Sequence, residues 1–125
     1  MQLTVTKQQV DDVAILELSG RMVLGDETAL FRNAVRELVA AGNKKILLNL
    51  GGVSYIDSSG LGELVGAFTA VRREGGQIKL LNLQKRVRDV VQIVKLETLF
   101  EPFDDETAAL ASFDKAPDAV KARAS

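Results

Sequence analysis

The chain has 125 residues, 46% of them hydrophobic and 26% charged, and its formal net charge is −1. This length and balance indicate one globular domain with a single core, and the lack of net positive charge disfavours nucleic-acid binding. Histidine and cysteine are both absent, which excludes disulfides, thiolate chemistry, histidine zinc sites, a Ser-His-Asp triad and a phosphohistidine relay on this chain.

Hydrophobic periodicity then divides the chain into strands and helices. Period-two alternation and short apolar runs predict strands, whereas apolar positions that recur every three or four residues predict helices. In chain order we expect strands at 3–6 and 13–18, a helix at 26–41, a strand at 45–50, a helix at 59–74, a strand at 77–83, a helix at 85–94, a short extended segment at 99–103 and a last helix from Asp104 or Asp105 to 113. Turns or loops are expected at 8–12, 21–25 and 51–55.

Three of the predicted helices have a clear apolar face. Asp26 is the expected N-cap of the first helix, and Gly42 with Asn43 is expected to end it. The side chains expected to point inward are Phe31, Ala34, Val35, Leu38 and Val39 in the first helix, Leu61, Leu64, Val65, Phe68 and Val71 in the second, and Val87, Val90, Val91 and Val94 in the third.

The order of these segments predicts an α/β fold. A short connection makes the first two strands an antiparallel hairpin, and strands that alternate with helices form a parallel sheet with right-handed crossovers. We expect a mixed, mostly parallel central sheet of about five strands with four helices, in which the first strand is antiparallel. Residues 1–113 would form the domain, and residues 114–125 a flexible C-terminal tail. No apolar run reaches the roughly 18 residues of a membrane span, and no signal peptide is evident, so we expect a cytoplasmic protein without direct membrane insertion.

A short polar segment joins the third predicted strand to the second predicted helix, with the sequence Ile56-Asp57-Ser58-Ser59-Gly60-Leu61-Gly62. Backbone N–H groups are unpaired at such a junction and the helix dipole favours negative charge there, so an anion is tolerated. The hydroxyl of Ser58 is therefore either an N-cap or an acceptor for a phosphate. Asp57 either orients that hydroxyl, accepts its proton, or closes an Asx turn.

Two glycines near the start of this helix need a physical reason, because glycine destabilises a helix interior by about 1 kcal/mol relative to alanine. Gly60 and Gly62 would give clearance for the backbone of a partner protein, or for a nucleotide that the partner holds. The alternative is tight packing of the helix on its own sheet, which applies about equally to Gly66.

At this point the sequence resembles a known family. The run Asp57-Ser58-Ser59-Gly60-Leu61-Gly62 is similar to the signature of the STAS domain, specifically that of the bacterial anti-sigma factor antagonists. The resemblance extends over roughly residues 3–113 and includes Gly20, Leu48-Asn49-Leu50, Gly75-Gly76 and the run from Leu80 to Leu83. The segment 21–27 departs from the acidic pattern of many relatives, which puts the identity of the partner in doubt but not the fold.

The resemblance implies a regulatory partner switch in which catalysis belongs to the partners. The unphosphorylated antagonist binds an anti-sigma factor, which is also a serine kinase, and thereby frees a sigma factor. Phosphorylation at Ser58 blocks this binding, and a metal-dependent serine phosphatase reverses it. We expect no metal or cofactor on this chain, and a monomer or weak dimer. The partner-binding residues implied are Asp57, Ser58, Ser59, Gly60, Leu61, Gly62 and Asp26.

Other functions fit the sequence less well. In a receiver domain Asp57 would be the phosphate acceptor. However, the acidic pair Asp11 and Asp12 precedes a strand and so lies at its wrong end, and the expected lysine after the fifth strand is missing. Hydrolase and nucleotide-binding motifs are incomplete. The main alternative keeps the fold and changes the role, to a non-phosphorylated STAS scaffold in a stress-signalling complex or beside a membrane transporter.

Overall fold

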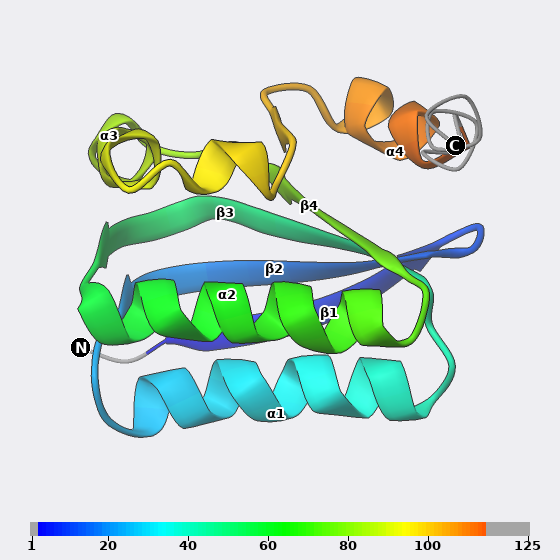
Figure 1. Cartoon of the computed structure of the whole chain (residues 1–125), viewed down its shortest axis with the longest axis horizontal. Helices are drawn as coiled ribbons and strands as arrows, with labels where there is room; N and C mark the ends of the chain where they lie inside the picture. Colours follow the sequence, from blue (N-terminus) through cyan, green and yellow to red (C-terminus); the bar gives the residue numbers. More distant parts are fainter. Residues whose placement is uncertain (1–2, 115–125) are drawn as a thin grey trace.

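A five-stranded mixed sheet, with the strands in the order β1-β2-β3-β4-β5, forms the centre of the computed structural model, which describes residues 3–114 (Figure 1). The elements are β1 (Thr4–Val10), β2 (Val13–Met22), α1 (Asp26–Ala40), β3 (Lys45–Ile56), α2 (Ser58–Arg73), β4 (Gln77–Leu81), α3 (Lys85–Ile93), the 3-10 helix η1 (Leu96–Thr98), β5 (Pro102–Phe103) and α4 (Glu106–Asp114). Strand β1 is antiparallel to β2 and all other pairs are parallel, which confirms the predicted fold. Apart from Asp114, the tail expected at 114–125 lies outside the described residues.

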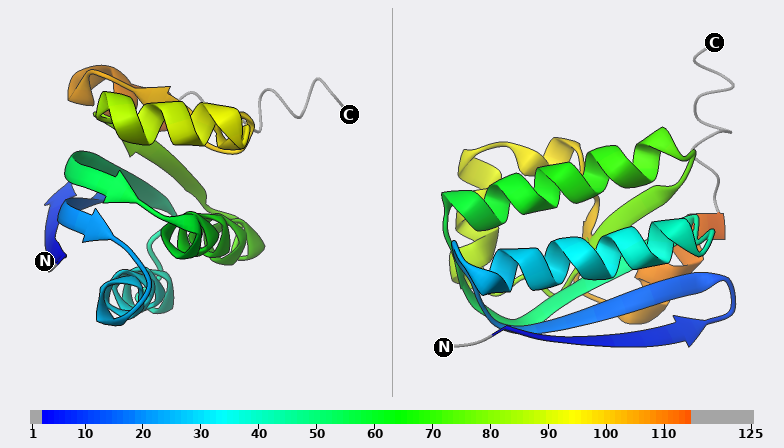
Figure 2. Two further views of the ribbon diagram at one scale, coloured as in Figure 1. Left: turned by 90° about the vertical axis from the view of Figure 1, so that its left-hand side faces the viewer. Right: turned by 90° about the horizontal axis from the view of Figure 1, so that it is seen from below.

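Helices lie on both sides of the sheet. Helices α1 and α2 pack side by side on one face, whereas α3, η1 and α4 lie on the opposite side (Figures 1 and 2). Strand β3 is buried on both faces, as its apolar run predicted, because Ile46, Leu47 and Leu48 are all 0% exposed. None of the helices in the described part of the chain is both long enough and apolar enough to span a lipid bilayer.

A buried lysine fastens α4 to the sheet. Lys79 in β4 is 5% exposed, and its ammonium lies 4.9 Å from the ring centroid of Phe113 and 5.7 Å from that of Phe103. It donates a hydrogen bond to the hydroxyl of Ser112 at 2.8 Å and forms an ion pair with Glu101 at 2.8 Å. These contacts compensate the burial of its charge. Lysine is normally exposed, but here Lys79 is buried and holds α4 against β4.

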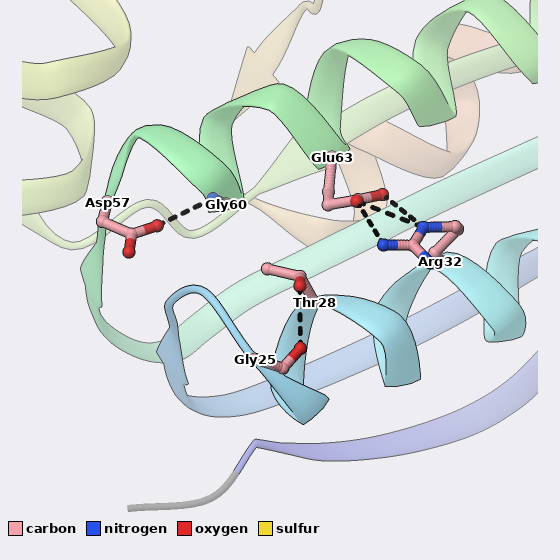
Figure 3. A network of polar contacts seen from close by, with 6 residues as sticks. All are labelled: Gly25, Thr28, Arg32, Asp57, Gly60 and Glu63. Atoms are coloured by element: carbon pink, nitrogen blue, oxygen red, sulfur yellow. Dashed lines mark hydrogen bonds and ion pairs between the residues drawn. The ribbon is translucent and has the colours of Figure 1, made fainter.

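Three strands are longer than the sequence predicted. β1 continues to Val10, β2 to Met22 and β3 to Ile56, which corrects most of the turn and loops expected in those places. The pairing of β2 with β3 continues through two register shifts until Met22 lies opposite Ile56. Polar residues in these extensions had favoured loops, but the ladder between the strands satisfies their backbone groups. Because β2 and β3 end together, the starts of α1 and α2 lie next to each other (Figure 3).

Some details of the helices also differ from the prediction. Asp26 is the first helical residue of α1 and not its N-cap; Gly25 holds that position, at φ +129°, without a side-chain hydrogen bond. Val65 and Val94 do not point inward, since they are 37% and 46% exposed. In α2 the buried position belongs to Ala67 instead of Val65, because the helix turns a different face to the sheet. The 3-10 helix η1 was not predicted.

Two predicted helix ends are confirmed. Helix α1 ends with Gly42 in a left-handed conformation at φ +92°, and the backbone N–H of Asn43 donates to the carbonyl of Leu38 at 3.0 Å. This is the glycine-terminated geometry that the sequence indicated. At the start of α4 the carboxylate of Asp105 accepts a hydrogen bond from the backbone N–H of Ala108 at 2.9 Å, as an N-cap does.

Candidate functional site

The predicted site lies where β3 passes into α2, at the end of the sheet where the carboxyl ends of β2 and β3 lie together. Ser58 is the first residue of α2 and is exposed, whereas Ser59 is partly buried. The N-cap is Asp57, in an extended conformation, and its Oδ1 accepts a hydrogen bond from the N–H of Gly60 at 2.9 Å (Figure 3). The interpretation of Ser58 as the N-cap is therefore wrong, and its hydroxyl is not used to start the helix.

Asp57 also ties the segment before α1 to the start of α2. Its second carboxylate oxygen, Oδ2, accepts a hydrogen bond from the backbone N–H of Leu24 at 3.0 Å, and its own N–H donates to the carbonyl of Met22 at 3.1 Å. The pKa of the Asp57 carboxyl lies below its usual range, mainly because the carboxylate accepts the hydrogen bond from the N–H of Gly60. The hydrogen bond from the N–H of Leu24 is the next largest cause. The carboxylate is thus charged at neutral pH and is committed to backbone donors, and no hydrogen bond joins it to the Ser58 hydroxyl within residues 3–114.

Packing within the domain requires a glycine at position 60. A Cβ at this position would lie 2.4 Å from the carbonyl oxygen of Met22 and 2.7 Å from Cγ1 of Ile56. Gly60 is buried, so its reason is the close approach of α2 to the end of β2 rather than clearance for a partner. This close approach lets Asp57 reach the N–H of Leu24.

Gly62 and Gly66 have no such reason. A Cβ at either position would find no heavy atom of the described residues within 4 Å, and both residues are exposed. The packing of α2 on its own sheet, considered for Gly66, is therefore excluded. Gly62 remains compatible with the approach of a partner, which no contact within the chain opposes.

The surroundings of Ser58 contain apolar side chains that the sequence analysis did not single out. Leu24, held beside Asp57 by its backbone hydrogen bond, is 75% exposed, and Tyr55 is 37% exposed. The guanidinium of Arg21 lies 5.0 Å from the ring centroid of Tyr55. Leu24 therefore places exposed apolar surface close to the accessible Ser58. The signal in the sequence was weak, because an apolar residue in a short loop is usually covered.

The structure brings the predicted site residues into one region. The residues from Asp57 to Gly62 form the cap and first turns of α2, with Leu61 partly buried against the core. Asp26 is exposed at the start of α1, which the hydrogen bond between Leu24 and Asp57 holds near α2 (Figure 3). Within residues 3–114, no group of three or more acidic side chains is placed to hold a metal ion.

The receiver-domain alternative is not supported by this geometry. Asp11 and Asp12 form the turn between β1 and β2, and the register places the start of β2 beside the start of β3. Asp57 follows the carboxyl end of β3, whereas this acidic pair lies at the amino ends of β2 and β3, so the two sites are at opposite ends of these strands. Asp12 pairs instead with Lys45, whose ammonium lies 2.7 Å from its carboxylate and lowers its pKa.

Comparison with known proteins identifies the family. The model of the STAS domain matches residues 4–109. The chain is 43% identical to the anti-sigma-B factor antagonist of Bacillus subtilis (strain 168) over 49 residues, which are 39% of this chain and 45% of that relative. The fold resembles that of the Thermotoga maritima protein TM1081, described as a candidate anti-sigma factor antagonist, with a TM-score of 0.81, 28% identity, and coverage of 86% of this chain and 92% of that one.

A more distant neighbour is the Bacillus cell fate determinant SpoIIAA in its phosphorylated form, with a TM-score of 0.70 and 21% identity. The match covers 88% of this chain and 99% of that one, and at this identity it shows a common fold. The family model spans nearly all of the described residues, and the matched range includes the Asp57–Gly62 segment. The chain therefore belongs to the STAS domain family.

Proposed function

We propose that this protein is an anti-sigma factor antagonist that acts in a phosphorylation-controlled partner switch. The unphosphorylated chain binds an anti-sigma factor serine kinase and frees a sigma factor. The kinase phosphorylates Ser58 and binding is lost, and a serine phosphatase restores the active form. In this proposal the chain is the substrate of its partners, requires no cofactor of its own, and works in the cytoplasm, where sigma factors act.

The exposed position of Ser58 at the first residue of α2 carries this proposal. The helix N-terminus stabilises a negative charge by about 0.3–1 kcal/mol, so a phosphate there leaves the domain folded. Ser59 is partly buried, which makes Ser58 the more accessible of the two hydroxyls. Because Asp57 already caps the helix, modification of Ser58 removes no hydrogen bond that the fold needs.

The surface around Ser58 explains how a phosphate would block a partner. Leu24 is exposed beside the site, and the carboxylate of Asp57 already carries a negative charge there. A phosphate adds about −1.5 to −2 charges to this surface. Burial of that charge in an interface without a cation costs several kcal/mol, and each 1.4 kcal/mol is a factor of about ten in affinity.

Co-purification from the native host, followed by phosphosite mapping and binding measurements on the recovered kinase, tests the proposal. We expect Ser58→Asp to lower the affinity for the kinase at least tenfold, and Ser58→Ala to bind normally without being switched off by ATP. Ser59→Ala is the matched control for the acceptor position, and ATP should still switch off the binding that this variant shows. Phosphate found on Ser59 alone would contradict the assignment of the acceptor.

The same experiment separates the switch from the scaffold role. Recovery of a transporter subunit or a stress-signalling complex, with no kinase and no phosphate on Ser58, would mean that this STAS domain acts as an unmodified interaction module. Recovery of a kinase that binds the Ser58→Ala variant but not the Ser58→Asp variant would exclude that role as its main function.

A further inference from the structure

A groove runs between α1 and α2 on the face of the domain away from α4. It encloses about 550 Å³ and is lined on the α2 side by Gly62, Gly66 and Ala70, and at its rims by Arg36 and Arg73. Residues four apart lie on the same side of a helix, so the three small residues form one continuous strip. The two helices lie side by side in every view of the fold (Figures 1 and 2).

The groove is open above Gly62 and Gly66, two glycines that no contact among the described residues requires. No heavy atom of residues 3–114 lies within 4 Å of a Cβ placed at Gly62 or Gly66. Both residues are inside a helix, where alanine would be more stable. The space above them is therefore open, and no contact within the described part of the chain requires a glycine at either position.

The groove also carries uncompensated positive charge. Arg32 is neutralised by Glu63, to which it donates three hydrogen bonds across the groove, the shortest at 2.7 Å (Figure 3). Arg36 and Arg73 are exposed, and neither has a hydrogen bond or ion pair with any described residue. Three arginines against one glutamate leave the lining with a net charge of +2.

We propose that the α1–α2 groove is a docking site for an acidic helical segment of a partner protein. The positive rims favour an acidic occupant over a neutral or basic one. From Gly62 to Arg73 the helix rises about 16 Å at roughly 1.5 Å per residue, a length that suits a segment of about three turns better than a compact ion. The small strip lets the backbone of that segment come close to α2.

This site goes beyond the switch at Ser58 and does not require a phosphate there. Gly62 lies one turn after Ser58, so the groove continues from the phosphorylation surface along α2. A partner docked there is held by charge and by close backbone packing, and the Ser58 hydroxyl takes no part in its binding. The chain would then have two adjoining surfaces along α2 that share Gly62, and only the first contains the phosphate acceptor.

Titration of the ¹⁵N-labelled full chain with a synthetic peptide tests the proposal by NMR. The probe is a 16-residue alanine-based helix with glutamate at every fourth position, and the control peptide has glutamine in those places. At low ionic strength we expect the acidic peptide to shift the amide signals of Gly62, Gly66 and Ala70, and the glutamine peptide to shift none of them.

Three groove variants and one control variant decide whether the binding uses the groove. Arg36→Gln and Arg73→Gln should each weaken binding two- to fivefold, the range of exposed ion pairs, whereas Arg86→Gln on α3 is the control and should leave it unchanged. Gly66→Ala should weaken binding at least threefold and yet raise the melting temperature, because the added methyl group fills the groove without a clash inside the domain.

Several results would overturn the proposal. Signal shifts spread over all exposed lysines and arginines would mean non-specific charge attraction, and equal shifts with inorganic phosphate would mean a small-anion site. Unchanged affinity in the Gly66→Ala variant would show that close approach to α2 is not needed. Shifts confined to the Ser58 region would place the acidic segment on the other surface. The phosphorylation proposal would survive each of these outcomes, since none of them involves Ser58 as an acceptor.

Discussion

The first turn of α2 and the turns that follow it contain glycines for opposite reasons. At Gly60 a Cβ would lie 2.4 Å from the backbone carbonyl of Met22, so the glycine is required by a contact inside the domain. At Gly62 and Gly66 a Cβ would meet no described heavy atom within 4 Å. The same residue type thus indicates a closed contact at one position and an open surface only two positions later.

This difference divides α2 into a fixed start and an accessible middle. At the start, Asp57 holds the N–H groups of Gly60 and Leu24, which fixes the helix against the end of β2. In the middle, two glycines together weaken the helix by about 2 kcal/mol relative to alanine, a noticeable part of the roughly 5–15 kcal/mol that stabilises a typical domain. A rigid start suits a modification site, and an open middle suits the approach of another chain.

The largest effect is expected from Gly60→Ala. The new methyl group would collide with the backbone of Met22, which cannot move as a flexible side chain does, so we expect a loss of about 3 kcal/mol of unfolding free energy. The midpoint of urea denaturation, followed by circular dichroism, measures this loss. A variant as stable as the wild type would show that α2 is not held closely against β2.

The next effect concerns the charge of Asp57. Its pKa is lowered in the folded state by the N–H groups of Gly60 and then Leu24, so the stability it contributes is present above the unfolded-state pKa of about 4 and is lost as the pH falls through the lower folded-state value. Asp57→Asn should destabilise the protein at pH 7, and the difference from the wild type should shrink as the pH drops below about 4.

Urea midpoints of the wild type and the Asp57→Asn variant, measured between neutral pH and about pH 2.5, check this behaviour. Ser59→Ala retains the carboxylate and serves as the control, so its profile should follow that of the wild type. A constant difference between wild type and Asp57→Asn at all pH values would mean that the charge of Asp57 is not what holds the helix start.

A smaller effect of opposite sign is expected at Gly62. Gly62→Ala adds a methyl group in open space on a helix and should raise the unfolding free energy by about 1 kcal/mol. Differential scanning calorimetry would record it as a higher melting temperature. The changes in unfolding free energy in Gly60→Ala and Gly62→Ala should have opposite signs. A loss of stability in both variants would refute the division of α2 into a closely packed start and an open middle.

The sequence predicts the fold well because the fold follows from local patterns. The apolar run at Ile46, Leu47 and Leu48 requires a strand covered on both faces, and the three- and four-residue spacing of α1 requires a helix on one of those faces. The polar junction at Asp57 and Ser58 is visible for the same reason, because it stands between a strand and a helix. These features need no knowledge of distant contacts.

The parts that the sequence did not predict depend on residues far apart in the chain. The reason for Gly60 lies at Met22, and the N–H that Asp57 holds belongs to Leu24. The exposure of Val65 depends on how α2 is rotated against the sheet, and periodicity alone leaves that rotation uncertain by one position. The groove exists only because α1 and α2 pack side by side, so no local pattern indicates it.

The smallest effect is expected at the ion pair between Arg32 and Glu63, which joins the two helices. Their side chains are 40% and 22% exposed, so water and salt screen the pair. Arg32→Gln and Glu63→Gln should each lower the unfolding free energy by less than Gly60→Ala or Gly62→Ala changes it. A double-mutant cycle of the two ion-pair residues should give an interaction free energy that fades near about 1 M salt. A coupling that persists at high salt would mean that the pair is buried in solution, with α1 and α2 closer together than the open groove allows.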